Sequence, residues 1–327
     1  MTYAVAILNY NGSILLRKFI SKVVKNCSDA VIYLIDNNST DSSVEFINKN
    51  YPLDNNYGYA KGYNEAVKYI DEDVIIFLNN DAVFLDSDSF STIKKTFESN
   101  EMISIAQPRI LDYNNQDKYE YAGASGGYLD FLGYPFCRGR ILGNIEKSDK
   151  YNTTREIFWA SGSCFIIRKS IFKLLNGFDE DFFCHMEEID LCWRLKNLNS
   201  SYKIITIGKA NVYHVGGGTM QYGGNRKNYL NFRNSLVMLI KNLPKKYFIF
   251  SLFLRLICDL FILIFSVLLF RFGLSFSILS AYYFNIFNFR KSLSKRKKGL
   301  GSYKYFICFS ILINYYFFGK KTFSSIK

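Results

Sequence analysis

An aspartate that directly follows a short apolar stretch is the residue of this sequence best placed for metal chemistry. Residues 74–78 are Val-Ile-Ile-Phe-Leu, and Asn79, Asn80 and Asp81 come next. Such a run fits a strand buried on both faces of a parallel sheet, so the polar residues lie at the carboxyl edge, where open α/β sheets bind ligands. Mg²⁺ and Mn²⁺ prefer oxygen ligands and are often held by one or two carboxylates. Asp81 is therefore a candidate metal ligand, although a carboxylate there could also only cap the next helix.

Two further apolar stretches end on polar loops, and we expect these loops to lie beside Asp81. Residues 3–8 precede the polar turn 9–12, and residues 31–35 precede the acidic stretch 36–41. Strands that alternate with helical patterns predict βαβ units and a mainly parallel sheet, with all three loops on one edge. A nucleotide would lie along that edge.

Seven short segments carry a family resemblance. In order they are Asn9-Tyr10-Asn11, Asp36-Asn37-Asn38-Ser39-Thr40-Asp41, Asn56-Tyr57-Gly58-Tyr59-Ala60-Lys61-Gly62-Tyr63-Asn64, Leu78-Asn79-Asn80-Asp81, Phe178-Asp179-Glu180-Asp181-Phe182-Phe183, Glu187-Glu188-Ile189-Asp190-Leu191-Cys192-Trp193-Arg194 and His214. The chain resembles family 2 glycosyltransferases and, among them, bacterial rhamnosyltransferase-like enzymes that build surface polysaccharides. The resemblance implies an α/β fold of the GT-A, Rossmann-like type, whose mixed, mainly parallel sheet is flanked by helices. It also implies a nucleotide-diphosphate-sugar donor, a divalent metal ion and an inverting transfer.

The resemblance assigns donor-binding roles to residues of the three loops. The implied donor-binding residues are Asn9, Tyr10, Asn11, Asp36, Asn38, Lys61, Asn64 and Asn80. Asp36 matches the acid that accepts a hydrogen bond from the donor base, and Tyr10 matches an aromatic residue beside that base. Asp36 could instead cap the following helix. Gly58 and Gly62 are expected to let the backbone and Lys61 approach the diphosphate.

The implied metal site has two protein ligands. Asp81 matches the metal-binding acid, and His214 matches the position that helps to hold the metal or the diphosphate. A Mn²⁺ or Mg²⁺ ion there would neutralise the negative charge that builds on the leaving diphosphate. Without the family context, His214 could equally be a structural histidine in a strand.

An acidic cluster at a predicted helix start supplies candidates for the general base. An inverting transfer needs a base on the face opposite the leaving group, and the family places it in this cluster, with aspartate as the second acid. Here the sequence is Glu187-Glu188-Ile189-Asp190, so Glu188 occupies that position and is one methylene longer. Glu187 or Asp190 could serve instead. The alternative is that these acids only favour the helix dipole.

Residues 110–156 do not alternate between strand-like and helical patterns and are rich in Tyr, Gly, Asn and Asp. A long insertion in a compact domain is usually functional or mobile, so this one is expected on the acceptor side. The same composition would also suit a plain β-hairpin. Residues 159–168 return to a strand-like pattern and resemble the family segment that lines the acceptor pocket.

The last part of the chain predicts attachment to a membrane. We expect a glycosyltransferase domain over 1–240 and membrane-associated helices over 241–327. Residues 247–270 are long and apolar enough to span a bilayer and are interrupted only by Arg255 and Asp259, which can neutralise each other at i and i+4. Residues 272–289 form a second apolar run. An in-plane amphipathic anchor is the alternative to a spanning hairpin.

A third, shorter apolar run over 303–318 is expected in the membrane interface. Basic residues flank the first two runs at 245–246, 290–291 and 295–298, which places both ends of the hairpin in the cytoplasm by the positive-inside rule. The net charge of +13 fits lipids of an anionic inner leaflet. No nucleic-acid-binding motif accompanies that charge, so nucleic acid is not expected as a partner.

The cysteines and the N-terminus indicate a reducing compartment. The seven cysteines show neither CxxC pairs nor metal-ligand spacing, which favours free thiols, and no signal sequence precedes the first strand. The active site is therefore expected at the cytoplasmic face of the cell membrane.

The predicted function is a metal-dependent hexosyltransferase that moves a sugar from a nucleotide donor, first of all dTDP-rhamnose or a UDP-sugar, to a hydroxyl of a growing, lipid-linked cell-surface glycan. Two alternatives stay open. A nucleotidyltransferase would be expected to carry a Gly-rich, basic loop after its first strand, which residues 9–12 lack. A scaffold that binds nucleotide sugars without turnover is suggested by Glu188 in place of aspartate.

Overall fold

The computed structural model describes residues 1–46, 51–216, 224–296 and 304–326. The strands are β1 (Tyr3–Asn9), β2 (Val31–Asp36), β3 (Tyr51–Pro52), β4 (Val74–Asn79), β5 (Ala82–Val83), β6 (Ile103–Asp112), β7 (Gly127–Leu129), β8 (Pro135–Cys137), β9 (Arg140–Ile141), β10 (Asn144–Ile145), β11 (Arg155–Glu156), β12 (Cys164–Arg168) and β13 (Lys203–His214). The α-helices are α1 (Ser13–Asn26), α2 (Gly58–Ala66), α3 (Ser87–Ser99), α4 (Lys169–Leu174), α5 (Glu187–Leu198), α6 (Asn225–Asn242), α7 (Phe248–Leu268), α8 (Phe272–Phe287), α9 (Phe289–Ser294), α10 (Ile311–Tyr316) and α11 (Phe323–Ile326), and short 3₁₀ helices include η3 (Glu180–Phe182).

The main sheet is mixed and mainly parallel, as predicted. Its strand order is β11-β13-β6-β12-β4-β1-β2-β3, with β5 paired to β13. The strands β1, β2, β3, β4, β6 and β13 share one direction, whereas β5, β11 and β12 run the opposite way. The register aligns Asn9 with Asp36 and Leu8 with Asn79, so the three predicted loops meet at one edge.

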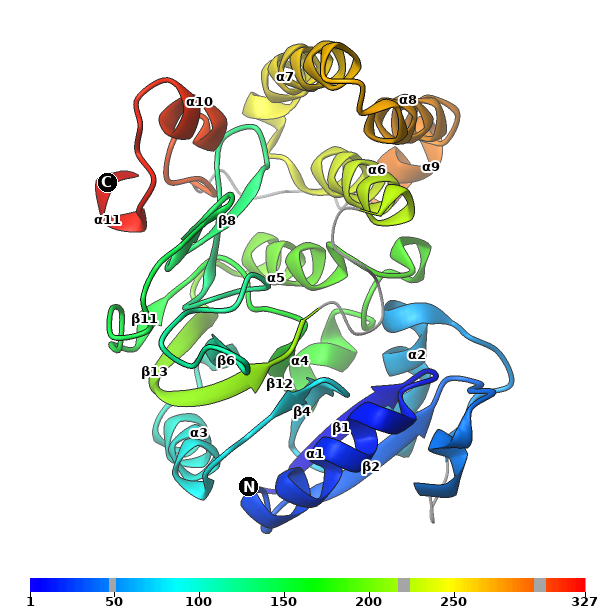
Figure 1. Ribbon diagram of the computed structural model, residues 1–327, viewed down its shortest axis with the longest axis vertical. Helices are drawn as coiled ribbons and strands as arrows, with labels where there is room; N and C mark the ends of the chain where they lie inside the picture. The colour runs from blue at the N-terminus through cyan, green and yellow to red at the C-terminus, as the bar shows by residue number, and fades with distance from the viewer. Residues whose placement is uncertain (47–50, 217–223, 297–303, 327) are drawn as a thin grey trace.

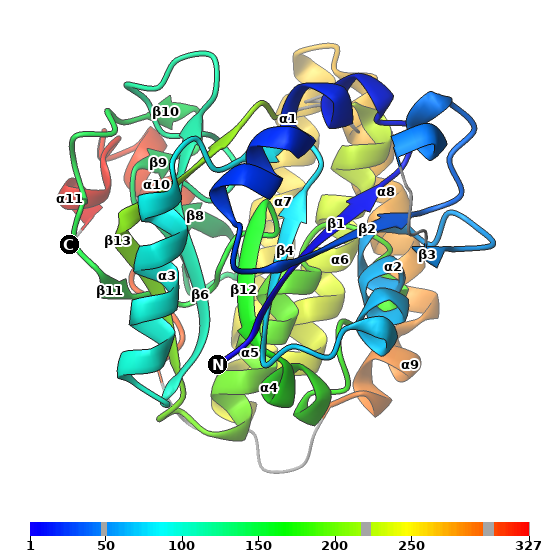
Figure 2. The ribbon, with the colours of Figure 1, turned by 90° about the horizontal axis from the view of Figure 1, so that it is seen from below.

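Alternating side chains on the central strands build a core on each face of the sheet. On β1, Val5 and Ile7 belong to the core that also contains side chains of α1 and α3, whereas Ala4 and Ala6 belong to the core that contains side chains of α2, α4 and α5. Figure 2 shows α1 and α3 on the near side of the sheet, with α6, α7 and α8 behind it. The helix α1 forms because the amphipathic spacing of Leu16, Phe19 and Val23 buries these side chains together.

The predicted insertion forms a second, four-stranded antiparallel sheet in the order β10-β9-β8-β7. It stands between the main sheet and the C-terminal helices (Figure 1). The third apolar run is not a long interfacial helix. Ile307 and Cys308 instead make backbone hydrogen bonds to Leu129 and Phe131 of the insertion, and only α10 is helical in this region. Tyr303, the first residue of that run, lies outside the described residues.

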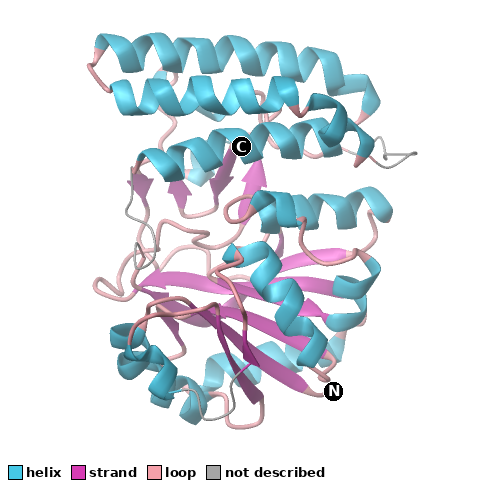
Figure 3. Cartoon of the chain, turned by 90° about the vertical axis from the view of Figure 1, so that its right-hand side faces the viewer, coloured by secondary structure: helices cyan, strands magenta, loops and turns pink. Residues whose placement is uncertain are grey.

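The helices α6, α7 and α8 pack side by side as a layer above the domain (Figure 3). One helical stretch in the described part of the chain, Lys245–Leu268, is long and apolar enough to cross a membrane, with a mean hydropathy of 2.5. The expected boundary at residue 240 falls within α6, which contacts both α5 and α8, and the division into two domains stays a prediction.

Candidate active site

A cavity of about 400 Å³ opens at the carboxyl edge of the parallel strands. It is the place where the predicted residues meet. Among the predicted site residues, those that line its wall are Asn9, Tyr10, Asn80, Asp81, Glu187, Glu188 and His214. The expected acceptor-side segments also reach this cavity, through Ala122 of the insertion and residues 161–163 before β12.

Strand pairing explains how Asp81 and His214, far apart in the sequence, come together. The short strand β5 follows Asp81 and pairs with the end of β13, so that Ala82 lies opposite His214. The backbone N–H of Val215 donates to the Asp81 carbonyl at 3.0 Å. The His214 Nε2 atom then lies 2.9 Å from the Asp81 carboxylate, and both side chains are buried.

A second acid, Glu120, contacts the other ring nitrogen of His214. Its carboxylate lies 3.1 Å from Nδ1 of His214, and its own backbone N–H donates to Ile110 of β6. Burial lowers the pKa of His214, but the two adjacent carboxylates, Asp81 first, outweigh that effect and raise it to about 10. The imidazole therefore lies between two acids. A histidine that binds a metal through one ring nitrogen commonly donates its other N–H to a carboxylate, and Glu120 is placed for that role.

The Asp81 and His214 side chains fit a divalent cation. If an oxygen and a nitrogen each lie about 2.1 Å from an ion and the two bonds make a right angle, the two atoms are about 3 Å apart. The Asp81 oxygen and the Nε2 atom of His214 are 2.9 Å apart. Within the described residues, no group of three or more His, Cys, Asp or Glu side chains is arranged as a metal cluster. An ion at this site would therefore take most of its ligands from the donor diphosphate and from water.

Glu187 and Glu188 form a pair of carboxyl groups that also line the cavity. Each keeps one buried carboxylate oxygen without a hydrogen-bond partner in the described part of the chain. Burial raises the pKa of Glu188 to about 7, and burial together with the neighbouring Glu188 raises the pKa of Glu187 well above its usual range. Near neutral pH burial and mutual repulsion therefore favour a shared proton on this pair.

The loop before α5 has an unusual backbone conformation and is tied to α6. Phe183, His185 and Met186 all have positive φ values, between 62° and 72°. Such conformations cost energy and persist only when surrounding contacts enforce them. The amide of Asn234 donates to the carbonyls of Phe182, Cys184 and His185 at 2.7–3.0 Å. This side chain, buried in α6, thereby fixes the path of the chain into Glu187 and Glu188.

The glycines of α2 allow close contacts with neighbouring segments. The N–H groups of Tyr59 and Ala60 donate to the Phe183 carbonyl, and a Cβ atom on Gly58 would lie 2.6 Å from that oxygen. A Cβ atom on Gly62 would meet the Leu8 side chain at 2.7 Å. Both glycines thus permit close packing within the protein. Gly58 also lines the cavity, and an approach of the backbone to the diphosphate stays a prediction. Gly217 and Gly218, which follow His214, lie outside the described residues.

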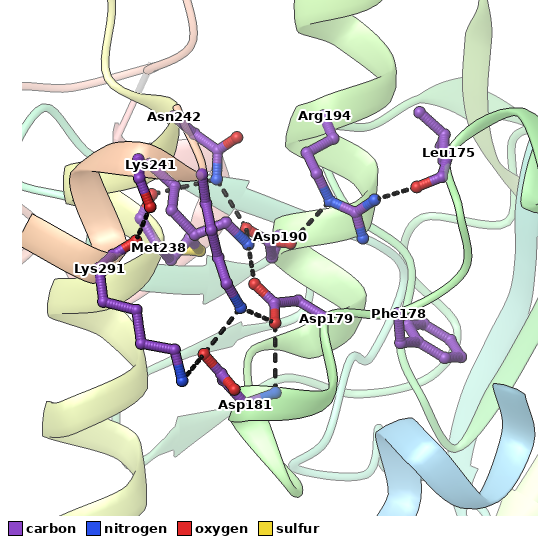
Figure 4. Close-up of polar contacts among 12 residues, drawn as sticks. Leu175, Phe178, Asp179, Asp181, Asp190, Arg194, Met238, Lys241, Asn242 and Lys291 are labelled. Atoms are coloured by element: carbon purple, nitrogen blue, oxygen red, sulfur yellow. Dashed lines mark hydrogen bonds and ion pairs between the residues drawn. The ribbon is translucent and has the colours of Figure 1, made fainter. Parts of the chain in front are cut away.

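Asp190 does not line the cavity. Its carboxylate contacts Arg194 at 2.8 Å and Lys241 at 2.8 Å and accepts a hydrogen bond from the Asn242 amide at 2.7 Å (Figure 4). Burial would raise the pKa of Asp190, but Lys241 and Arg194 outweigh burial and lower it. All its oxygens are engaged, and this geometry favours a structural role over the predicted catalytic one.

The donor-side residues divide into two groups. Asn80 donates to the Asn9 side chain at 2.9 Å, and both line the cavity together with Tyr10. Asp36 lies beside the cavity wall rather than in it. One of its oxygens accepts a hydrogen bond from the Ser39 backbone, while the other is buried without a hydrogen-bond partner in the described residues.

Besides Asp36, four other predicted donor-binding residues do not line the cavity. The Asn11 side chain accepts a hydrogen bond from Thr40, and Asn38 is an exposed residue with a φ of 65°. The Lys61 ammonium group lies over the ring of Tyr57. Asn64 exchanges two hydrogen bonds with the backbone of Phe178 at 2.9 Å, so it joins α2 to the segment before η3.

Several residues of the cavity wall were not predicted. They include Asn37, Asn56, Tyr59, His185, Arg226 and Lys227. The two cations begin α6 and bring positive charge to the wall, a property that suits a diphosphate. In the sequence, the one signal for these two residues is the Gly-rich stretch that precedes them. Nothing in the sequence linked Glu120 to His214.

Comparisons with known proteins agree with this geometry. The profile of glycosyl transferase family 2 matches residues 4–175. The chain is 29% identical to rhamnosyltransferase WbbL of Escherichia coli (strain K12) over 146 residues, which cover 42% of this chain and 54% of that protein. It is 38% identical to N-acetylglucosaminyl-diphospho-decaprenol L-rhamnosyltransferase of Mycobacterium tuberculosis (strain CDC 1551 / Oshkosh) over 60 residues, 18% of this chain and 19% of that one. The matched stretches thus span about half of these relatives or less.

A solved structure shares the fold. The crystal structure of GalNAc-T7 with UDP, GalNAc and Mn²⁺ aligns with a TM-score of 0.54 and 15% identity, covering 73% of this chain and 47% of that chain. At this identity the likeness concerns the fold alone, and it confirms the expected GT-A type. Since the family profile matches more than half of the 327 residues, the chain belongs to glycosyl transferase family 2.

Proposed function

We propose that the protein is a metal-dependent, inverting glycosyltransferase. It transfers a sugar from a nucleotide-diphosphate donor, with dTDP-rhamnose or a UDP-sugar as the first candidates, to a hydroxyl of a growing cell-surface glycan. The observation that carries this proposal is that a possible metal pair, Asp81 and His214, and a carboxyl pair, Glu187 and Glu188, line the same cavity. Glycosyl transfer requires both kinds of group, because negative charge develops on the leaving group while a base takes the proton from the attacking hydroxyl.

On the donor side, the free oxygen of Asp36 accepts a hydrogen bond from the base, and Tyr10 packs beside it. Asp81 and His214 hold a Mn²⁺ or Mg²⁺ ion, and Glu120 orients the His214 ring. Such an ion, when bound, neutralises charge on the leaving diphosphate. Arg226 and Lys227 add positive charge to the same wall.

On the acceptor side, Glu188 takes the proton from the attacking hydroxyl. Its pKa of about 7 suits a base that works near neutral pH. Glu187 stays protonated beside it and can donate a hydrogen bond to the acceptor. Asp190 serves as a structural anchor for α5 through its contacts with Lys241 and Arg194.

The acceptor is proposed to be linked to a lipid, and the site to lie at the cytoplasmic face of the cell membrane. Two findings support this. The helical stretch Lys245–Leu268 is apolar enough for a bilayer, and one matched relative is named as acting on a diphospho-decaprenol. All seven cysteines are free thiols, which agrees with a reducing compartment.

The test measures release of nucleoside diphosphate from UDP-, dTDP- and GDP-sugars by detergent-solubilised protein, with a lipid extract of the host as acceptor. We expect release from one donor with Mn²⁺ or Mg²⁺, no release with chelator, and strong loss in Glu188→Gln. Binding of a nucleotide sugar without release, across all donors and extracts, would favour the scaffold. Formation of a nucleotide sugar from a sugar phosphate would favour a nucleotidyltransferase.

A further inference from the structure

The helices α7 and α8 form a hairpin that lies along the protein rather than projecting from it (Figure 3). Ser277 of α8 donates to the Asn225 carbonyl at the start of α6, and Asn285 donates to the Arg233 carbonyl two turns later. The helices α6 and α8 therefore run in the same direction. The turn between α7 and α8 consequently lies at the end of α6 that carries Arg226 and lines the cavity.

The inward side of α7 carries its polar groups. Arg255 and Asp259 form an ion pair at 2.9 Å and are almost completely buried, at 2% and 0% exposure. The Tyr134 hydroxyl of the insertion and the Tyr282 hydroxyl of α8 both donate to Asp259. The Arg255 guanidinium also donates to the carbonyl of Leu132. These contacts hold the middle of α7 sideways against the insertion.

The outward side of the hairpin is apolar and exposed. Among its large side chains, Ile249 is 81% exposed, Phe253 57%, Ile264 54%, Phe270 80% and Phe276 72%. The only charged residues of α7 are the buried Arg255 and Asp259, and α8 has none. A contiguous apolar surface of this extent on a folded protein marks an interaction site.

Charge identifies the partner of this surface. From Lys245 to Arg296 the sequence contains eight Lys and Arg residues and a single acid, the buried Asp259. Exposed cations stand at both ends of the apolar helices, at Lys245 and Lys246, at Arg271 in the turn, and at Arg290 beyond α8. An apolar face with a basic rim matches a bilayer that contains anionic phospholipids.

We infer that α7 and α8 lie flat in the surface of an anionic phospholipid bilayer and do not cross it. This inference deepens the membrane attachment in the proposed function and rests on it. A spanning α7 would have to leave the insertion and carry Arg255 and Asp259 into hydrocarbon without Tyr134. In the flat arrangement the apolar side chains enter the acyl region, and the turn at Phe270 brings the membrane to the end of the molecule where the cavity opens. A lipid-linked acceptor can then reach Glu188 without leaving the bilayer.

The first experiment is flotation of the full-length protein with phosphatidylcholine vesicles, with and without phosphatidylglycerol. We expect binding that is stronger with phosphatidylglycerol, and a decrease of about tenfold or more in Phe253→Glu/Ile264→Glu. The matched control is Ile14→Glu, an equally apolar change on α1, where Ile14 is 80% exposed. Lys245→Ala/Lys246→Ala should weaken binding to the anionic vesicles by about fivefold per residue.

Equal flotation of the wild type and the Phe253→Glu/Ile264→Glu variant would overturn the docking surface. A stable dimer in lipid-free solution that this variant dissociates would overturn it as well, since a second copy would then cover the face. Circular dichroism of each variant shows whether it is folded, and the Lys245→Ala/Lys246→Ala variant tests the same surface without altering the apolar face.

The second experiment tests the topology in sealed membrane vesicles with Phe270→Cys and a membrane-impermeant maleimide, against the unsubstituted protein as baseline. If the hairpin lies flat, reagent added on the side opposite the catalytic domain should label residue 270 only after detergent is added. Labelling from that side in intact vesicles would show that α7 spans the bilayer. Neither experiment depends on sugar transfer, so a failure of the proposed activity and a failure of this inference are distinguishable.

Discussion

Lys241 of α6 and Asp190 of α5 form a buried ion pair in which the ammonium nitrogen lies 2.8 Å from the carboxylate (Figure 4). Lys241 also contacts Asp179 at 2.6 Å, and its side chain is only 3% exposed. The pair connects the helix that leads into the hydrophobic hairpin with the helix whose first turn carries Glu187 and Glu188. The helix that carries Glu187 and Glu188 and the apolar helices are thus parts of one packed structure.

Removal of the Lys241 charge should destabilise the protein strongly. Lys241→Met leaves Asp190 and Asp179 with less compensation in a buried site, and we expect a loss of about 3–5 kcal/mol in the free energy of unfolding. Urea denaturation of the solubilised protein measures it. Lys291→Met is the control, because Lys291 pairs with Asp181 at the surface and should contribute less than about 1 kcal/mol. Similar losses in the two variants would contradict the structural role of Lys241.

The pH dependence of transfer should report the ionisation of Glu188. A general base must be deprotonated, and burial raises the pKa of Glu188 to about 7. We therefore expect kcat/KM to rise as the pH increases through about 7 and to level off above it. In Glu188→Gln this limb should vanish and kcat should fall by about 10²–10⁴-fold, with donor binding retained. A limb that persists in Glu188→Gln but is lost in Glu187→Gln would assign the base to Glu187.

Asp81→Ala should abolish metal-dependent activity and weaken the binding of Mn²⁺ in the presence of nucleoside diphosphate. Electron paramagnetic resonance of free Mn²⁺ measures this binding without turnover. Asp86→Ala is a nearby control, because Asp86 caps α3 through a hydrogen bond from Ser89 and its loss should cost about 1 kcal/mol of stability only. Full activity in Asp81→Ala would exclude Asp81 as a metal ligand.

Glu120→Gln should weaken Mn²⁺ binding by about 10–100-fold, since the Glu120 carboxylate contacts Nδ1 of His214, whereas Asp81 lies at Nε2. The same Mn²⁺ titration measures the effect. Asp117→Asn, an exposed acid of the same insertion, should bind Mn²⁺ as the wild type does. Unchanged affinity in Glu120→Gln would leave Glu120 with a purely structural role.

The local sequence pattern was sufficient to predict the strands that position the donor-side loops. The apolar strands before Asn9, Asp36 and Asn79 each end where expected, and parallel pairing in one register is enough to bring their loops to one edge. The i and i+4 spacing of Arg255 and Asp259 likewise predicted an ion pair that the structure confirms. These are short-range properties, which depend on periodicity and on neighbours in the chain.

Contacts between distant segments decided the rest. Asn234 fixes the loop around His185, and Glu120 meets His214, through packing of helices and strands that no local pattern records. The position of Asp190 outside the cavity wall depends on where α6 places Lys241. Apolar composition alone indicated a membrane. The insertion decided which side of α7 faces the protein, because its Tyr134 hydroxyl donates a hydrogen bond to the buried Asp259.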